Sequence, residues 1–287
     1  MNKKRIIMLL LVIAALFTLS GCSIPTDPDT GKYILITDAT TFASTMDSEN
    51  WFTAIFVYPI AKYTNFLGGI MNVGLAVTLV TLTVHALILA LTFKANVGQV
   101  RMQDLQPDIQ KIQKKYEGKT DQESKMKLAQ ETQAIYTKEG INPLTTILVQ
   151  FIQFPVIIAM YQAVQRAEVV ANGSFLGMKL DATPLAGIQD GNFLYLVLFA
   201  VMIVAQFASM KIPMYLTERK GKALAAKQHR KYEKPANPLG NQMYIMIIFI
   251  SVLAINWPSA MTLYWIISSI VNVSKQVFIH NAITSKN

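Results

Sequence analysis

The chain has 287 residues and is too apolar for an ordinary soluble domain, since 52% of its residues are hydrophobic and only 15% are charged. Its formal net charge of +9 fits binding to nucleic acid or anionic lipid, or the basic loops of a multi-span membrane protein. One cysteine and three scattered histidines exclude an internal disulfide and a multi-cysteine zinc site, and no nucleotide-binding or hydrolase signature occurs, so we expect neither an enzyme nor a metal or cofactor.

Residues 1–22 have the layout of an export signal. Basic residues at positions 3–5 precede an uncharged run that ends in small residues. The last four letters, LSGC, match the bacterial lipoprotein cleavage box, and the only cysteine of the chain falls at the box position. We therefore expect a mature chain that begins at a lipidated Cys22 on the outer face of the plasma membrane. An uncleaved signal anchor is the alternative.

Residues 23–66 are expected to be extracellular. The second half of this segment, WFTAIFVYPIAKYTNF at 51–66, is rich in aromatic residues and too polar in its middle to span a membrane. Such a pattern is typical of an amphipathic helix that lies along the outer interface. An ordinary exposed loop is the alternative.

Long gaps between charged residues predict the spans, because about 20 apolar residues cross a bilayer. The gaps give spans at 67–93, 141–165 and 192–212, and a longer stretch at 242–280. One helix through the last stretch would be roughly 60 Å long, about twice the hydrocarbon core, so it must fold back. Pro258 supplies the turn within NWPS, since it lacks an N–H and disfavours helix in the residue before it.

The segments between the spans predict the topology. Residues 94–139 hold nine Lys and Arg residues and 211–234 hold eight, whereas the segments that alternate with them hold two each. By the positive-inside rule the basic segments are cytoplasmic, so the chain starts outside and ends inside. The division is a cytoplasmic hairpin at 94–140, an extracellular loop at 166–191, a cytoplasmic basic loop at 213–241 and a cytoplasmic tail at 281–287. Topology and anionic lipid then explain the net charge, and direct recognition of nucleic acid is not needed.

The hairpin is expected to be helical and to break at Glu117-Gly118-Lys119, with Asp121 as the N-cap of its second arm. Apolar stripes are expected to face each other across the two arms. They are Leu105, Ile109, Ile112 and Tyr116 in the first arm, and Met126, Ala129 and Tyr136 in the second. Capture of substrates or partners and a merely solvated charged hairpin are both compatible with this pattern.

Polar side chains within the spans gather at one depth. His85 lies nine residues before Lys94, about 13 Å from the inner end of its span, and the outer halves of the spans are mainly apolar. Because polar groups in hydrocarbon are costly and usually functional, this pattern predicts a hydrophilic groove open to the cytoplasm and closed outward. The candidate lining residues are Thr83, His85, Gln150, Gln153, Gln206, Trp265, Asn272 and Gln276. The alternative is that these groups only tie helices together by hydrogen bonds of about 0.6 kcal/mol each.

The sequence thus predicts an all-α polytopic membrane protein with five transmembrane helices around this groove. In that setting, ordered motifs from about residue 50 to 280 resemble the YidC/Oxa/Alb family of membrane-protein insertases, in the five-span lipoprotein form of Gram-positive bacteria. The motifs are NVGLAVTLVTLTVHALILALTFK, MQDLQPDIQKIQKKY, NPLTTILVQFIQFPVIIAMY, QFASMKIP and NWPSAMTLYWIISSIVNVSKQ, which are similar to the first span, the hairpin, and the second, third and fifth spans.

The resemblance implies an insertase that receives nascent, short-tailed hydrophobic proteins from the cytosol and releases them sideways into lipid. It also implies cooperation with the Sec translocon and with ribosomes or signal-recognition components. The family has an arginine in the groove on the first span, and the matching residue here is His85. An arginine is always charged, whereas an imidazole titrates near neutral pH. Two hypotheses stay open, a protonated anchor for acidic tails and a neutral imidazole bonded to a neighbouring Gln or Ser.

A small-solute transporter or channel is the rival class of function. It would predict an internal inverted repeat and a midplane site with broken helices, but the chain has no such repeat and its polar residues lie off-centre. A lipid-anchored scaffold without translocating activity is a third class, which the polar residues within the spans disfavour.

Overall fold

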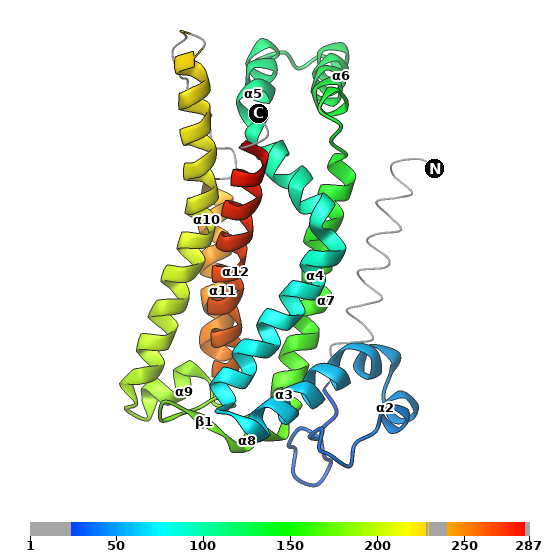
Figure 1. Ribbon diagram of the computed structural model, residues 1–287, viewed down its shortest axis with the longest axis vertical. Helices are drawn as coiled ribbons and strands as arrows, with labels where there is room; N and C mark the ends of the chain where they lie inside the picture. The colour runs from blue at the N-terminus through cyan, green and yellow to red at the C-terminus, as the bar shows by residue number, and fades with distance from the viewer. Residues whose placement is uncertain (1–23, 228, 230–239, 285–287) are drawn as a thin grey trace. The chain divides into compact units, whose positions relative to one another are not determined.

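The computed structural model describes residues 24–227, 229 and 240–284, which are mostly helical (Figure 1). The helices are α2 (Phe42–Ser48), the π-helix η1 (Thr53–Val57), α3 (Tyr58–Ile70), α4 (Val73–Asp104), α5 (Gln106–Lys115), α6 (Gln122–Lys138), α7 (Pro143–Arg166), α8 (Glu168–Asn172), α9 (Pro184–Gln189), α10 (Phe193–Lys227), α11 (Gly240–Asn256) and α12 (Ser259–Thr284). Strands β1 (Ser174–Phe175) and β2 (Met178–Lys179) pair antiparallel, with Ser174 opposite Lys179. The predicted all-α class is confirmed at this level.

Two of the described helices are long and apolar enough to cross a membrane by length and composition. They are α4, Val73–Asp104, and the part of α10 from Phe193 to Ala223. A shorter apolar helix covers Tyr244–Asn256. Both long helices continue past the predicted spans, α4 from 93 to Asp104 and α10 from 212 to Lys227. Lys, Arg, Gln and Met are good helix formers, so leaving the apolar run does not end the helix. The count of five spans stays a prediction.

Helix ends follow the local signals in the sequence. Pro143 occupies the first position of α7, where its missing N–H costs nothing. The chain leaves helix α11 after Asn256 and enters α12 at Ser259, so the break coincides with Pro258. The two stretches of the 242–280 segment are therefore separate helices.

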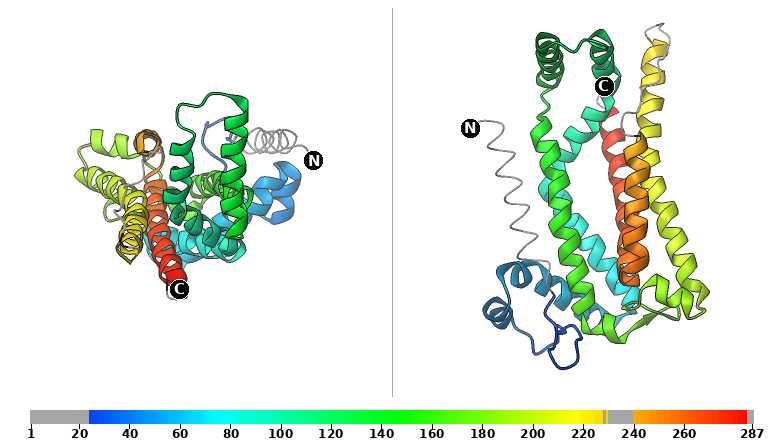
Figure 2. Two further views of the ribbon diagram at one scale, coloured as in Figure 1. Left: turned by 90° about the horizontal axis from the view of Figure 1, so that it is seen from above. Right: turned by 180° about the vertical axis from the view of Figure 1, so that it is seen from behind.

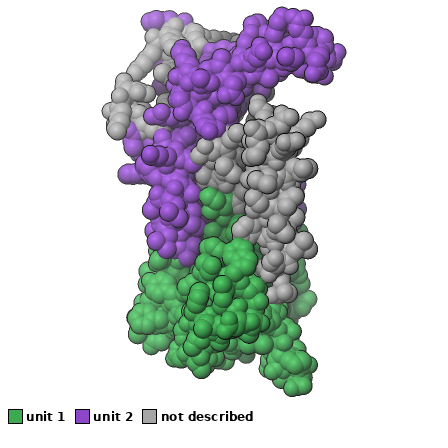
Figure 3. All heavy atoms as spheres, turned by 90° about the vertical axis from the view of Figure 1, so that its right-hand side faces the viewer, with its two compact units in different colours: residues 1–83, 152–202, 251–267 green, residues 84–151, 203–250, 268–287 purple. Residues whose placement is uncertain are grey.

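The chain forms two compact units, coloured separately in Figure 3. Unit 1 comprises residues 1–83, 152–202 and 251–267, and unit 2 comprises residues 84–151, 203–250 and 268–287. Helices α4, α7, α10, α11 and α12 each contribute one part to each unit.

Unit 1 contains α2, η1, α3, α8, α9 and the β-hairpin. Its core combines large apolar side chains with several alanines, which let helices approach closely. Ala54, Ala61, Ala76 and Ala163 are fully buried in this core. One close approach is at Gly74 on α4, where a Cβ would lie 2.3 Å from the ring of Phe175. Only a residue without a side chain fits there.

The aromatic stretch at 51–66 is helical, and the helix continues to Ile70. It is amphipathic. Ala54, Val57 and Ala61 are buried on one side, while Phe66 and Ile70 are about two-thirds exposed. Trp51, Ile55 and Phe56 are also exposed, so large apolar side chains cover the outward face. The stretch is therefore a helix and not a loop, and its position at the membrane interface stays a prediction.

Unit 2 contains the helical hairpin of α5 and α6, which lie side by side in Figures 1 and 2. Gly118 makes the turn at a φ of +79°, a value that favours glycine, and the Asp121 carboxylate accepts a hydrogen bond of 2.8 Å from the Ser124 N–H. Lys115 and Tyr116 on one side of the turn both reach the Oε1 atom of Glu131 on α6, at 2.6 and 2.8 Å.

The expected stripe on the second arm of the hairpin is wrong at two of its three positions, while Tyr136 is half-buried as expected. Met126 is 55% exposed and Ala129 is also exposed, whereas Leu128 and Ile135 are half-buried. Because α6 has few apolar residues, its sequence periodicity is compatible with more than one buried face. The bond from Tyr116 to Glu131 lies on the same side of α6 as Leu128 and Ile135, because these positions are separated by three and four residues.

Candidate functional site

Helix α12 is tied to two other helices by adjacent serines within unit 2. The hydroxyl of Ser268 lies 2.7 Å from Nε2 of His85 on α4. The hydroxyl of Ser269 donates to Oε1 of Gln206 on α10 at 2.8 Å. Neighbouring residues on a helix point about 100° apart, so one serine pair can bind two partners. These bonds are of the kind that the helix-tying alternative predicts, and they involve two of the predicted groove residues, His85 and Gln206.

The next two turns of α12 carry polar groups of a different kind. Asn272 and Gln276 are half-buried, and neither has a hydrogen-bond partner among the residues that the structure describes. A half-buried amide that no protein group satisfies needs water or a bound molecule. The part of α12 from Asn272 to Gln276 therefore offers open hydrogen-bonding capacity, whereas the Ser268–Ser269 level does not.

The α4 face that carries His85 also carries polar residues beyond the predicted span. Thr92 and Asn96 follow His85 by seven and eleven residues, which places all three on one side of the helix. Asn96 is only 3% exposed, and its Nδ2 donates to the carbonyl and hydroxyl oxygens of Thr92. Its Oδ1 atom has no partner within the described ranges. Asn96 is absent from the predicted lining residues because the predicted span ends at 93.

Lys275 is also absent from the predicted lining residues. In the sequence it only marks the end of a long run without charged residues. It lies on α12 seven residues after Ser268 and is half-buried. Its ammonium group interacts electrostatically with the imidazole of His85. The spacing of seven residues from Ser268 is the signal that could have placed it on the same face.

Three predicted lining residues belong to unit 1. Gln153 on α7 donates to the hydroxyl of Tyr264 on α12 at 3.0 Å. Trp265 is 6% exposed and stacks on Trp257, with ring centroids 5.4 Å apart and planes at 17°. Thr83 is exposed, and its hydroxyl donates to the Leu79 carbonyl of its own helix. Their role in a groove stays a prediction.

Two predicted functional positions lie outside what the structure describes. Cys22 falls in the undescribed first 23 residues, and the side chain of Gln150 is not described either. No group of His, Cys, Asp and Glu side chains that could hold a metal ion is found in the described parts of the chain.

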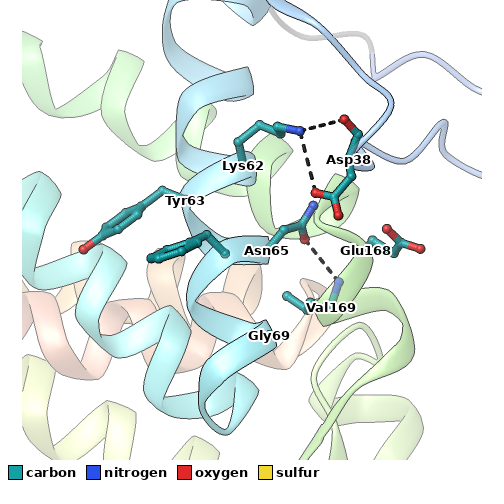
Figure 4. Close-up of a pocket in the computed structure, with 8 residues that line it drawn as sticks. Asp38, Lys62, Tyr63, Asn65, Gly69, Glu168 and Val169 are labelled. Atoms are coloured by element: carbon teal, nitrogen blue, oxygen red, sulfur yellow. Dashed lines mark hydrogen bonds and ion pairs between the residues drawn. The ribbon is translucent and has the colours of Figure 1, made fainter.

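A hollow of about 630 Å³ lies in unit 1 beside α3 and the start of α8 (Figure 4). Two of its polar residues, Lys62 and Asn65, are already bonded to backbone groups. Lys62 donates to the carbonyls of Thr37 and Asp38, and Asn65 bonds the Ile36 carbonyl and the Val169 N–H. These bonds fasten the 36–38 segment to α3 and α8, so the hollow is a consequence of how the segment is attached.

Long apolar helices that carry hydrogen-bonding side chains on selected faces define an α-helical membrane protein. The family model described as 60Kd inner membrane protein matches residues 64–286. The chain belongs to this family.

Curated relatives extend the similarity to almost the whole chain. It is 31% identical to "Membrane protein insertase MisCA" of Bacillus subtilis over 99% of this chain and 95% of that protein. It is 32% identical to "Membrane protein insertase YidC 1" of Listeria monocytogenes over 99% of this chain and 86% of that protein. It is 29% identical to "Membrane protein insertase YidC" of Oceanobacillus iheyensis over 99% of both. The resemblance inferred from the motifs is therefore confirmed.

Proposed function

We propose that this protein is a membrane protein insertase that moves short polar tails of hydrophobic proteins from the cytosol into the bilayer through a hydrophilic groove. Near full-length similarity to proteins named membrane protein insertases supports the activity. The observation that carries the route is that Asn272 and Gln276 of α12 are half-buried and have no hydrogen-bond partner among the described residues. No covalent step is involved.

The free-energy cost of insertion comes from moving the polar flanking tail across the bilayer and not from inserting the apolar helix. Taking a tail's polar groups through hydrocarbon costs several kcal/mol when they have no partners. A groove that water and amide groups reach from the cytosol shortens the dry path. The apolar segment then enters lipid through its own hydrophobicity, at about 25 cal/mol per Å² of surface buried.

The proposed lining residues in unit 2 are His85, Gln206, Asn272 and Gln276. The amides of Asn272 and Gln276 have no partner in the described part of the chain, whereas His85 and Gln206 are bonded to serines of α12. Those two bonds hold α4 and α10 against α12 and orient the lining. Thr83, Gln150, Gln153 and Trp265 are kept as further candidates on the basis of polarity and depth.

In the proposed topology the protein is a five-span protein of the bacterial plasma membrane. Cys22 is lipidated and lies outside, and the carboxyl end lies in the cytoplasm. The distribution of Lys and Arg between alternate segments supports this orientation. The exposed apolar face of η1 and α3 supports an interfacial position for residues 51–70 on the outer side.

The proposed partners are nascent membrane proteins, the Sec translocon and membrane lipids. The hairpin α5–α6 and the basic loop at 213–241 are the proposed contacts for ribosomes or signal-recognition components. Both arms of the hairpin have exposed charged side chains. They are Lys111 and Asp108 on α5 and Lys127 and Glu123 on α6. Such a surface suits transient electrostatic capture.

Reconstitution tests the proposal against its rivals. The purified protein is placed in liposomes, and insertion of a single-span substrate with a short translocated tail is measured beside leakage of small solutes. An insertase protects the substrate tail from external protease without solute flux. Flux without insertion would establish a transporter or channel, and the absence of both would leave a scaffold.

A further inference from the structure

Lys211 on α10 is held against α11 by aromatic side chains. Its ammonium group lies 5.4 Å from the ring centroids of both Phe207 and Tyr244, and Nζ donates a hydrogen bond of 3.3 Å to the Tyr244 hydroxyl. Phe207 lies on α10, one turn before Lys211, whereas Tyr244 lies on α11. All three residues belong to unit 2. Because the face of an aromatic ring attracts a cation, contacts from two helices orient this ammonium group.

The contact leaves hydrogen-bond donors for another molecule. A lysine ammonium has three N–H donors, and the Tyr244 hydroxyl accepts one of them and keeps its own O–H to donate. Neither Lys211 nor Tyr244 has a further hydrogen bond or an ion pair with a side chain that the structure describes. In the sequence of α10 and α11 the only acidic residue is Glu218, which pairs with Lys222 at 2.8 Å. A positive charge with additional donors and no adjacent acidic group suits the oxygens of a phosphate.

Lys211 lies where the apolar part of α10 ends. The 18 residues from Phe193 to Met210 carry no charge, and in a helix they rise about 27 Å, close to the thickness of a hydrocarbon core. In the topology proposed above, α10 runs toward the cytoplasm, so Lys211 lies at the level of the inner headgroups. The cytoplasmic leaflet carries the negative surface potential of a membrane.

Exposed apolar side chains continue from Lys211 toward the centre of the membrane. Val204 on α10 is 68% exposed and lies seven residues before Lys211, on the same side of the helix. Ile248 on α11 is 63% exposed and lies one turn after Tyr244. Since α10 enters the cytoplasm and α11 leaves it in the proposed topology, both residues lie on the hydrocarbon side of the contact between Lys211 and Tyr244. A phospholipid has the same order, with a phosphate followed by an acyl chain.

We propose that Lys211 and Tyr244 bind the phosphate of an anionic phospholipid in the inner leaflet, and that its acyl chain lies along Val204, Phe207 and Ile248. This inference goes beyond the insertase function and rests on the proposed orientation of the chain. Selectivity comes from charge, because the cation of a zwitterionic headgroup would meet the like charge of Lys211 and no adjacent carboxylate. The apolar side chains select a lipid over a free phosphate, which has no acyl chain to bury.

The test is lipid binding to the purified full-length protein in detergent micelles, measured by native mass spectrometry. Phosphatidylglycerol is compared with phosphatidylcholine of the same acyl chains. We expect the first phosphatidylglycerol to bind about tenfold more tightly than phosphatidylcholine. Lys211→Gln should abolish this preference, and Lys211→Arg should retain it. Tyr244→Phe, which keeps the ring and loses the hydroxyl donor, should weaken binding of phosphatidylglycerol about threefold.

Lys222→Gln is the matched control. It removes the same charge from the same helix, but Lys222 is exposed and paired with Glu218, so the preference should stay within about twofold of that of the parent protein. Equal losses in Lys211→Gln and Lys222→Gln would overturn the proposal, because net charge and not this geometry would then attract the lipid. Equal affinities of the parent protein for the two lipids would overturn it as well.

A competition experiment tests the apolar part of the site. Glycerophosphoglycerol, the water-soluble headgroup of phosphatidylglycerol, should not displace the lipid at equal concentration. Displacement would show a phosphate site without an acyl-chain contact and would overturn the lipid assignment. If Lys211→Gln does not fold, Tyr244→Phe and this competition still decide the proposal. Because no substrate insertion is measured, failure of the lipid site is distinguishable from failure of the proposed function.

Discussion

Arg166 and Glu49 form a two-point ion pair in unit 1. Nη1 and Nη2 of the guanidinium donate to the two carboxylate oxygens at 2.7 and 2.6 Å. Nε of Arg166 donates to the Ile34 carbonyl at 2.7 Å, and the Arg166 carbonyl accepts from the Ile36 N–H at 2.7 Å. One residue at the end of α7 therefore holds both ends of the 34–49 segment.

Removal of this arginine should be strongly destabilising. Its side chain is 1% exposed and that of Glu49 is 11% exposed, so Arg166→Ala leaves a nearly buried carboxylate without its partner. We expect the free energy of unfolding to fall by about 3–5 kcal/mol, seen as a lower thermal midpoint in detergent micelles. Arg166→Lys should be intermediate, because it keeps the charge but loses the two-point geometry.

A double variant and a surface control define what would contradict this prediction. Arg166→Ala with Glu49→Ala should be less destabilising than Arg166→Ala alone, because no charge is left unpaired. Asp38→Asn should have little effect, since the Asp38 carboxylate is fully exposed and 3.8 Å from Lys62. Equal midpoints for Arg166→Ala and Asp38→Asn would show that the ion pair does not hold the segment.

The bond between His85 and Ser268 predicts a weak effect on stability and a larger one on insertion. Interhelical hydrogen bonds in membrane proteins average about 0.6 kcal/mol, so a double-mutant cycle of His85→Ala and Ser268→Ala should give a coupling of that order. His85→Ala should nevertheless reduce insertion in a complementation assay, and His85→Arg should restore it. If the alanine variant inserts every substrate as well as the parent, His85 has no anchoring role.

The hairpin should loosen in acid. The hydrogen bond from Lys115 lowers the pKa of Glu131 below its ordinary value of 4.5, with a second contribution from Tyr116. A carboxylate with a lowered pKa stabilises the paired arms above the unfolded pKa, and this contribution is lost as the pH falls through the folded value. The same bond raises the pKa of Lys115 above 10.5, so its contribution persists through neutral pH and is lost only in strong base.

Hydrogen exchange can measure this pH dependence. After correction for the intrinsic rate, amides of α5 and α6 should exchange faster near pH 4 than near pH 7. Glu131→Gln should exchange at the faster rate at both pH values and show no acid transition. An acid transition of the same size in Glu131→Gln would assign it to another group.

Close packing at Gly74 predicts the sign of an alanine substitution. Alanine is favoured over glycine in a helix by about 1 kcal/mol, but its Cβ would lie 2.3 Å from the Phe175 ring, and overpacking costs about 1–3 kcal/mol. We expect Gly74→Ala to lower the thermal midpoint and Phe175→Leu to restore part of it. Gly69→Ala is the matched control, because no atom lies within 4 Å of its Cβ position. It should be neutral or slightly stabilising.

The local pattern of the sequence was sufficient for the helices and for several of their ends. Asp121 caps α6 as expected, and the break beside Pro258 separates α11 from α12. Caps, prolines and apolar runs act over a few residues, so neighbouring letters determine them. The ordered motifs are also sufficient to indicate the family without any coordinates.

The sequence did not predict which side chains contact each other in the folded chain. The adjacent residues Ser268 and Ser269 bond to different helices. Arg166 is a buried ion-pair residue and not an exposed loop residue. In the hairpin, Leu128 is half-buried whereas Met126 is exposed.

The sequence by itself therefore determined which residues are helical, which helices are apolar and which family the chain belongs to, because these follow from short-range periodicity and ordered motifs. Only the tertiary structure decided which polar groups satisfy each other and which, such as Lys275 and Asn272, are left without a partner in the described chain. The physical reason is that a helix's rotation about its axis is set by packing against segments far away in sequence, and a rotation of 100° replaces one neighbour by the next.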